Sequence, residues 1–144
     1  MSELQLKLNA EEVFSFLESV FPAVRGRFSV RELSPMRVIM RRETGPNDIR
    51  PGGTVSGPAM FEMADCAFYV AVLAMIGRQP LTVTSGAAIN FLNKPAPTAL
   101  ICEARILKLG RTLATGDALL WSEGQEKPVA HATLTYAIPR SAAV

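Results

Sequence analysis

The sequence predicts an α+β protein in which an antiparallel sheet wraps around one long apolar helix. The stretch 58–76 is apolar except for two acids, Glu62 and Asp65, and so predicts a largely buried helix. Four strand-like segments follow within residues 81–138, and the short turns between them are typical of a four-stranded antiparallel meander. The 144 residues are enough for one domain, spanning 1–144, with a substantial core.

The elements before the long helix are marked by capping and turn residues. Within residues 1–22, Asn9 and Glu12 form a capping-box pattern ahead of an apolar repeat, and Pro22 ends the predicted helix. The segments "RFSVREL" and "MRVIMRRE" predict two strands around a Ser-Pro turn. Residues 44–57, "TGPNDIRPGGTVSG", form a loop rich in Gly and Pro, which predicts a functional loop or a surface excursion.

The long helix and the strands after it have equally clear limits. Pro58 suits the first position of a helix, and Gly77 suits its end. The predicted strands are Leu81–Leu92, Ala99–Leu109, Arg111–Ser122 and Val129–Ile138. Apolar residues fall on both faces of these strands, which indicates a second packing partner, most simply another copy of the chain.

Composition excludes several classes of function. A net charge of +2 without a Lys/Arg cluster argues against a nucleic-acid partner. The N-terminus lacks the apolar core of a secretory signal, and the two acids disfavour a membrane span at 59–76, so we expect a cytoplasmic protein. Cys66 and Cys102 lie in apolar patterns and are expected to be buried free thiols.

The residues for metal or triad chemistry are too few. The single histidine, His131, lies in a strand pattern, and one His with two distant Cys cannot make a zinc site. No GxSxG motif occurs, and "RPGGTVSG" lacks the GK[ST] of a phosphate-binding loop. What remains is a carboxylate on a helix preceded by a glycine turn. That pair can serve acyl transfer or hydrolysis, with backbone N–H groups as donors.

The two acids of the helix have different expected environments. Glu62 lies in the first turns, where a carboxylate favours the positive helix N-terminus and can point to solvent. Asp65 lies beyond the strong dipole effect, and the face that it occupies suits a pocket wall or an interface. That face also carries Phe61, Glu62, Phe68, Tyr69 and Val72. An interface salt bridge to an arginine is the alternative explanation for Asp65.

Four segments resemble the PaaI-like group of hotdog-fold acyl-CoA thioesterases: "GGTVSGPAMFEMADCAFYVA", "TVTSGAAINFLNKPAP", "ARILKLGRTLATGDALLWSEG" and "PVAHATLTY". The resemblance implies a hotdog fold, a homodimer or homotetramer, and an acyl-CoA site at the subunit interface. It also implies that Gly57 N–H polarises the thioester carbonyl and that Asp65 is the catalytic base or nucleophile. Ser56 stands where the family has a catalytic-turn His, and Pro58 stands where it has a second Gly.

The resemblance also implies a set of substrate contacts. Arg50 takes a position that is commonly Asn or Gln, and Lys94 and Arg111 lie in turns that approach the CoA phosphates in relatives. Tyr69 takes a position that faces the site from the partner subunit. Asn90 is a weaker pocket candidate, and Phe61 belongs to the aromatic set that permits an aromatic or medium-chain acyl group. No metal or redox cofactor is expected, because coenzyme A enters as part of the substrate.

Two other functions use the same scaffold. Ser56, Pro58 and Arg50 favour a non-catalytic acyl-CoA binding or regulatory protein, in which Arg50 could pair with Asp65. A hydratase of 2-enoyl thioesters is less well supported, since those enzymes pair a His with an acid and His131 lies in another segment.

Overall fold

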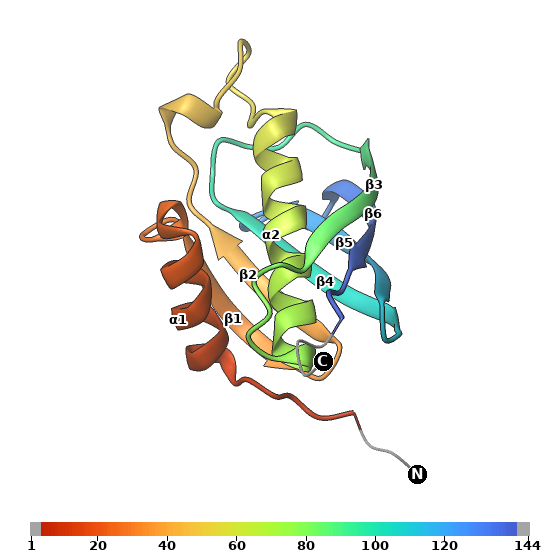
Figure 1. Ribbon diagram of the computed structural model, residues 1–144. Coiled ribbons are helices and arrows are strands. Elements are labelled where there is room, and N and C mark those ends of the chain that lie inside the picture. Colours follow the sequence, from red (N-terminus) through yellow and green to blue (C-terminus); the bar gives the residue numbers. More distant parts are fainter. Residues whose placement is uncertain (1–3, 141–144) are drawn as a thin grey trace.

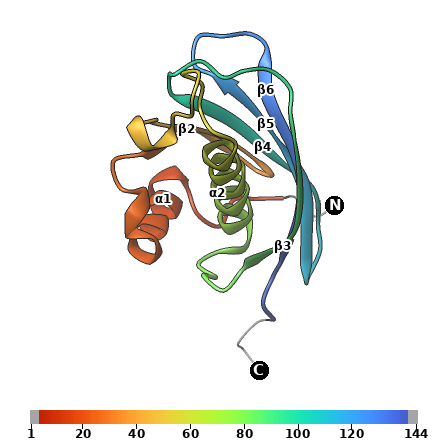
Figure 2. The same cartoon turned by 90° about the horizontal axis from the view of Figure 1, so that it is seen from above.

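The computed structural model describes residues 4–140 and shows a six-stranded antiparallel sheet curved around one helix, α2 (Figures 1 and 2). The strand order across the sheet is β1-β2-β4-β5-β6-β3. The strands are β1 (Phe28–Ser34), β2 (Arg37–Arg42), β3 (Val83–Phe91), β4 (Leu100–Leu109), β5 (Leu113–Ser122) and β6 (Pro128–Ala137). The predicted α+β class, a sheet wrapped on a long helix, is confirmed.

Helix α2 (Gly57–Ile76) begins one residue before Pro58, the predicted first residue, and ends before Gly77 as predicted. The Ser56 side chain caps it by accepting from Ala59 N–H, and Gly77 closes it with a φ of +96°. The helix is long and apolar enough to cross a membrane, but 72% of its most apolar window is buried inside the fold. The apolar character of α2 is therefore accounted for by its place in the core.

The predicted meander over 81–138 is wrong at one strand. β4, β5 and β6 do pair in sequence order, but β3 pairs with β6 on the far edge of the sheet instead of with β4. The segment 92–99 carries the chain from the end of β3 past the first turns of α2 to β4 (Figure 1). Turn residues such as those of "NKPAP" predict that a strand ends, but they do not distinguish a tight hairpin from a crossover.

Two short 3₁₀ turns and one further helix complete the fold. Helix α1 (Ala10–Val20) has the predicted capping box, since Glu12 N–H donates to Asn9 and the Glu12 side chain accepts from Asn9 N–H. The 3₁₀ turn η1 (Pro22–Val24) follows it directly, and η2 (Pro46–Asp48) lies in the loop before α2. Figure 2 shows α1 on the side of α2 that faces away from the sheet. The space between α1 and α2 is where the site described below opens.

Close packing of α2 on the sheet depends on one glycine. A Cβ added to Gly116 of β5 would lie 2.6 Å from the Phe68 ring and 1.9 Å from the Arg105 carbonyl oxygen. The missing side chain therefore makes room for Phe68, which is fully buried.

Candidate active site

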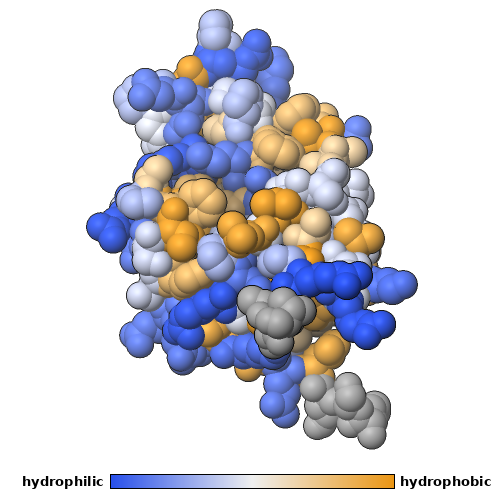
Figure 3. All heavy atoms as spheres, viewed as in Figure 1, coloured by the Kyte–Doolittle hydropathy of each residue, from blue (hydrophilic) through white to orange (hydrophobic). Residues whose placement is uncertain are grey.

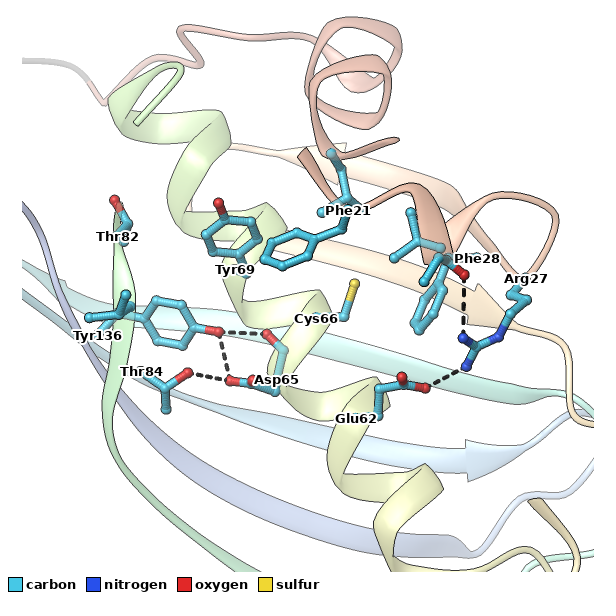
Figure 4. Close-up of a pocket in the computed structure, with 14 residues that line it drawn as sticks. Phe21, Arg27, Phe28, Glu62, Asp65, Cys66, Tyr69, Thr82, Thr84 and Tyr136 are labelled. Atoms are coloured by element: carbon cyan, nitrogen blue, oxygen red, sulfur yellow. Dashed lines mark hydrogen bonds and ion pairs between the residues drawn. The ribbon is translucent and has the colours of Figure 1, made fainter. Parts of the chain in front are cut away.

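Asp65 lies at the wall of a cavity of about 450 Å³ between α2, the end of α1 and the start of β3. Figure 4 shows Thr84 and Tyr136 pointing at Asp65, with the Phe21 and Tyr69 rings beside each other farther along the cavity. The lining residues are Leu17, Phe21, Ala23, Val24, Arg27, Phe28, Glu62, Asp65, Cys66, Tyr69, Thr82, Val83, Thr84 and Tyr136. The cavity is thus apolar over most of its wall and polar at the carboxylate.

Two hydroxyl groups hold one oxygen of the Asp65 carboxylate. Thr84 Oγ1 donates to Oδ1 at 2.7 Å, and the Tyr136 hydroxyl lies 2.6 Å from the same Oδ1 and 2.8 Å from the Asp65 carbonyl oxygen. Within residues 4–140, no group donates to Oδ2. The carboxylate is therefore fixed in orientation, with one oxygen unengaged. Within residues 4–140, no arginine of the same chain forms an ion pair with Asp65.

Two titratable groups of the cavity wall, Tyr136 and Cys66, stay protonated. Burial, together with the Asp65 charge and hydrogen bond, raises the pKa of Tyr136, so its hydroxyl keeps the proton that it donates. Burial, with the charge of Glu62 next in importance, raises the pKa of the Cys66 thiol to about 12. Cys66 is therefore a neutral part of the cavity wall and not a thiolate nucleophile. Cys66 and Cys102 are both free.

Glu62 has a structural partner, which the sequence did not predict. Its Oε1 accepts from Nη2 of Arg42 at 2.6 Å and from Nη2 of Arg27 at 2.6 Å. Arg42 is 2% exposed and also donates to both carboxylate oxygens of Asp48, at 3.0 and 3.1 Å. The expectation that Glu62 simply points to solvent is incomplete: its side chain is 47% exposed but neutralises a buried guanidinium.

Gly57 lies at a second cavity, of about 380 Å³, at the N-terminal end of α2. No group in residues 4–140 accepts a hydrogen bond from Gly57 N–H. Arg50 and Lys94 line the same cavity, as does Phe91. The structure thus brings together three of the residues that the sequence singled out: the glycine amide and the two cations.

Ser56 points to a different side of the turn. Its hydroxyl caps α2, and the residue lines a third cavity with Arg42 and Asp48. Its backbone N–H donates to the Asp48 carbonyl oxygen at 2.7 Å. Ser56 therefore shapes the turn that carries Gly57.

The other predicted site residues are dispersed. Tyr69 lines the Asp65 cavity and donates its hydroxyl to the Pro80 carbonyl oxygen at 3.2 Å. Phe61 is half-buried and lines none of the cavities described above. Asn90 is exposed and pairs in register with His131, which bonds Asp117 on the sheet face turned away from α2. Arg111 lies in the β4–β5 turn, and the strands on either side of that turn place it at the Val83 end of β3.

Thr84 and Tyr136 are the site residues that sequence reasoning missed. Both lie in the quoted segments "TVTSGAAINF" and "HATLTY", where a Thr or Tyr is ordinary strand composition. Only the register of β3 against β6, which pairs Thr84 with Tyr136, brings the two hydroxyls to one carboxylate. A strand-pairing prediction would have been the signal that finds them.

Gly57 and Asp65 cannot act on one carbonyl within one chain. They are eight residues apart on the same helix, which is about 12 Å along its axis, and they line different cavities. Among residues 4–140, no group of three or more His, Cys, Asp or Glu side chains is placed to hold a metal ion.

Thr82 carries the one buried side-chain polar atom without a hydrogen-bond partner in the described range. The residue is 3% exposed and lies beside the Asp65 cavity. Replacing it with valine keeps the shape and removes the desolvated hydroxyl, so we expect stabilisation by about 1 kcal/mol and a Tm higher by roughly 3 °C. A thermal melt of Thr82→Val beside Thr98→Val, whose hydroxyl is bonded and exposed, measures this. A lower Tm in Thr82→Val would show that its hydroxyl is bonded in solution.

The six-stranded antiparallel sheet wrapped on one long helix is the fold of a hotdog protein. The sequence profile described as "Thioesterase superfamily" matches residues 52–129, which is more than half of the chain, and the chain belongs to this superfamily. A provisionally assigned thioesterase from Silicibacter sp. TM1040 is 47% identical over 94% of this chain and 95% of its own, with a TM-score of 0.88. The membership and the high identity confirm the predicted family.

Two more distant structures share the fold. A variant of the phenylacetic acid degradation protein PaaI from Thermus thermophilus is 23% identical over 82% of this chain and 99% of its own, with a TM-score of 0.71. A protein from Streptococcus mutans bound to acetyl-CoA is 22% identical over 82% of this chain and 94% of its own, with a TM-score of 0.70. A comparison with curated proteins gave no match.

Proposed function

We propose that the protein hydrolyses acyl-CoA thioesters to the free acid and CoA. The observation that carries the proposal is the Asp65 carboxylate, which two hydroxyls hold by Oδ1 while Oδ2 is unengaged beside an apolar cavity. A relative of this fold was solved with acetyl-CoA bound, which supports a CoA thioester as the substrate. We place the reaction in the cytoplasm, in agreement with the two free thiols.

The active unit that we propose is a dimer formed along β3. This strand pairs with β6 on one side only and is exposed over nearly its whole length. Val83 and Phe91, at its two ends, are 55% and 54% exposed. A long, exposed edge strand with apolar side chains tends to pair with a strand of another molecule, and the simplest partner is β3 of a second copy. A homotetramer would be a pair of such dimers.

Antiparallel pairing of two β3 strands would also complete the site. β3 runs opposite to α2, because Phe91 contacts the Gly57 end of the helix and Thr84 contacts Asp65. A two-fold axis across β3 sets the Phe91 end of one strand beside the Val83 end of the other. Gly57 of one copy then approaches Asp65 of the second, which removes the separation of about 12 Å along one helix.

In the proposed reaction, Gly57 N–H donates to the thioester oxygen as negative charge develops there. Asp65 Oδ2 either takes a proton from a water that attacks the carbonyl carbon or attacks that carbon itself, in which case water then hydrolyses the mixed anhydride. The C–S bond breaks, and CoA leaves as the thiol after it takes up a proton. Lys94 and Arg50 lie beside Gly57 and would bind the CoA phosphates. Arg111 of the second copy lies near the Val83 end of its β3, and antiparallel pairing of the two β3 strands would bring that end close to Lys94 and Arg50.

A non-catalytic acyl-CoA binding protein is the second candidate. Ser56 uses its hydroxyl as a helix cap, and Pro58 offers no amide to an oxyanion. A screen of acyl-CoA thioesters with a thiol reagent separates the two functions. Release of the CoA thiol by the purified protein supports hydrolysis, whereas calorimetric binding of the same thioesters without release supports the second candidate.

The Gly57 amide can be removed with a matched control. Gly57→Pro deletes the N–H at a helix position that accepts proline, whereas Gly57→Ala keeps it. Both variants add a Cβ at 3.2 Å from the Phe91 ring. We expect kcat of Gly57→Pro to be about 10²–10³-fold below that of Gly57→Ala, as for other lost oxyanion donors. Equal kcat values would exclude the amide from the reaction.

If each site is shared between two copies, two inactive variants should complement each other. Mixing Gly57→Pro with Asp65→Asn under conditions that exchange subunits restores one intact site in each mixed dimer, or about one quarter of wild-type activity. No recovery, despite confirmed exchange, would place both groups in one chain.

A further inference from the structure

The far wall of the Asp65 cavity is built by the N-terminal part of the chain. Leu17 of α1, together with Phe21, Ala23 and Val24 of the turn that follows, lines the cavity opposite α2. This segment lies outside residues 52–129, the part that the superfamily profile describes. The superfamily profile therefore does not describe this wall.

The volume and the lining of the cavity select the chemistry of its occupant. About 450 Å³ lies within the range of small-molecule sites, roughly 300–1,000 Å³, and an acetyl group would leave most of it unfilled. Aromatic rings form the wall beyond Asp65. Phe21 meets Tyr69 edge to face at 5.8 Å between ring centroids, and Tyr69 lies 6.0 Å from Tyr136. The polar groups gather at the carboxylate and at the Arg27–Glu62 ion pair.

The mouth of the cavity is apolar and open. Phe21 is 51% exposed and Val83 is 55% exposed, and both line it. Figure 3 shows hydrophobic side chains gathered across the middle of this face, between α1 and β3. A neutral apolar group that extends from a carbonyl at Asp65 would cover these surfaces.

We infer that the segment Phe21–Val24, with Leu17, is the specificity wall of the acyl subsite, and that the subsite takes uncharged apolar acyl groups larger than acetyl. The inference rests on the proposed function in one respect, which is that the thioester carbonyl lies at Asp65 and the acyl group extends from there. Ala23 and Phe21 then control the length of the group from opposite directions. A larger side chain at Ala23 shortens the space, and a smaller one at Phe21 extends it.

The test is a profile of kcat/KM over acetyl-, hexanoyl-, octanoyl-, dodecanoyl- and phenylacetyl-CoA. We expect the wild type to prefer octanoyl- or phenylacetyl-CoA to acetyl-CoA by at least about 100-fold in kcat/KM. Comparison of octanoyl-CoA with phenylacetyl-CoA then shows whether the subsite takes a straight chain or an aromatic ring. Ala23→Leu should lower the octanoyl value about tenfold, and Phe21→Ala should raise the dodecanoyl value relative to octanoyl about tenfold.

Phe14→Ala is the control, because Phe14 is a half-buried α1 aromatic residue that does not line the cavity. Its profile should match the wild type. An unchanged order of preference in both Ala23→Leu and Phe21→Ala, or a wild type that prefers acetyl-CoA, overturns the inference.

A binding experiment separates this inference from the proposed function. In the Asp65→Asn background, octanoyl-CoA should bind more tightly than CoA by calorimetry, and Ala23→Leu should weaken that binding about tenfold. If the wild type releases no CoA but this pattern holds, hydrolysis is wrong and the subsite stands. If hydrolysis is observed but octanoyl-CoA binds no better than CoA, with or without Ala23→Leu, the subsite is wrong.

Discussion

Asp65→Asn is expected to lower kcat for thioester hydrolysis by about 10²–10⁴-fold, the range typical of a lost general base. Asparagine keeps the side-chain shape, and its Oδ1 can still accept from Thr84 and Tyr136, which donate to that atom in the native protein. The change removes only the basic and nucleophilic character of the unengaged oxygen. The Tm should therefore stay close to that of the wild type, and steady-state kinetics with a thiol reagent measures the loss.

Asp117→Asn is the matched control for this change. Asp117 pairs with Arg105 and His131 on the other face of the sheet, away from the cavity. Its substitution makes the same chemical change, and kcat should not fall. The opposite pattern, full activity in Asp65→Asn and loss in Glu62→Gln, would move the chemistry to the other acid of the helix and contradict the assignment.

The helical part of the site could be predicted because it depends on local sequence. Ser56 and Pro58 mark the start of α2, and a spacing along one helix then fixes where Asp65 lies relative to Gly57. The helical periodicity puts Asp65 and Glu62 on one face, and their different distances from the helix N-terminus predicted that they would have different environments. Their actual partners, two hydroxyls for one and two guanidinium groups for the other, confirm that difference.

The partners themselves could not be predicted, because they come from strands distant in sequence. Tyr136 follows Asp65 by 71 positions and reaches it only through the β6–β3 register. Arg42 likewise meets Asp48 and Glu62 only once β2 is packed against α2. A meander prediction puts β3 beside β4, on the wrong side of the sheet. Local turn chemistry does not contain the pairing that builds the carboxylate site.

Arg42→Met is expected to destabilise the protein by about 3 kcal/mol and to lower its Tm by roughly 10 °C. The guanidinium is 2% exposed, donates to Asp48, Glu62 and the Glu43 carbonyl oxygen, and lies 5.6 Å from the centre of the Phe28 ring. Methionine fills the volume, but it leaves Asp48 without its cation and leaves Glu62 with Arg27 alone. We take the low end of the range for a broken buried ion pair, because the two acids are partly exposed.

Arg41→Met is the control from the adjacent position. Arg41 is on the other face of β2, is 25% exposed and pairs with Glu123 and Glu43 near the surface. The same substitution there should cost less than about 1 kcal/mol. Equal losses of stability in urea titrations of the two variants would show that the buried cluster contributes no more than a surface pair.

The pH dependence of this difference identifies Asp48 as the linked group. Hydrogen bonds from Arg42 hold the pKa of Asp48 below its ordinary value, against desolvation, which raises it. A carboxyl group with a lowered pKa adds stability above its unfolded pKa, about 3.9, and loses it as the pH falls through the native value. The stability gap between wild type and Arg42→Met should therefore be constant from about pH 5 to 8 and narrow below about pH 4. The lowered pKa values of Asp117 and Glu123 are common to both proteins and cancel in the difference. A gap that persists unchanged into acid would mean that Arg42 stabilises the fold by packing on Phe28 and not through its ion pair with the Asp48 carboxylate.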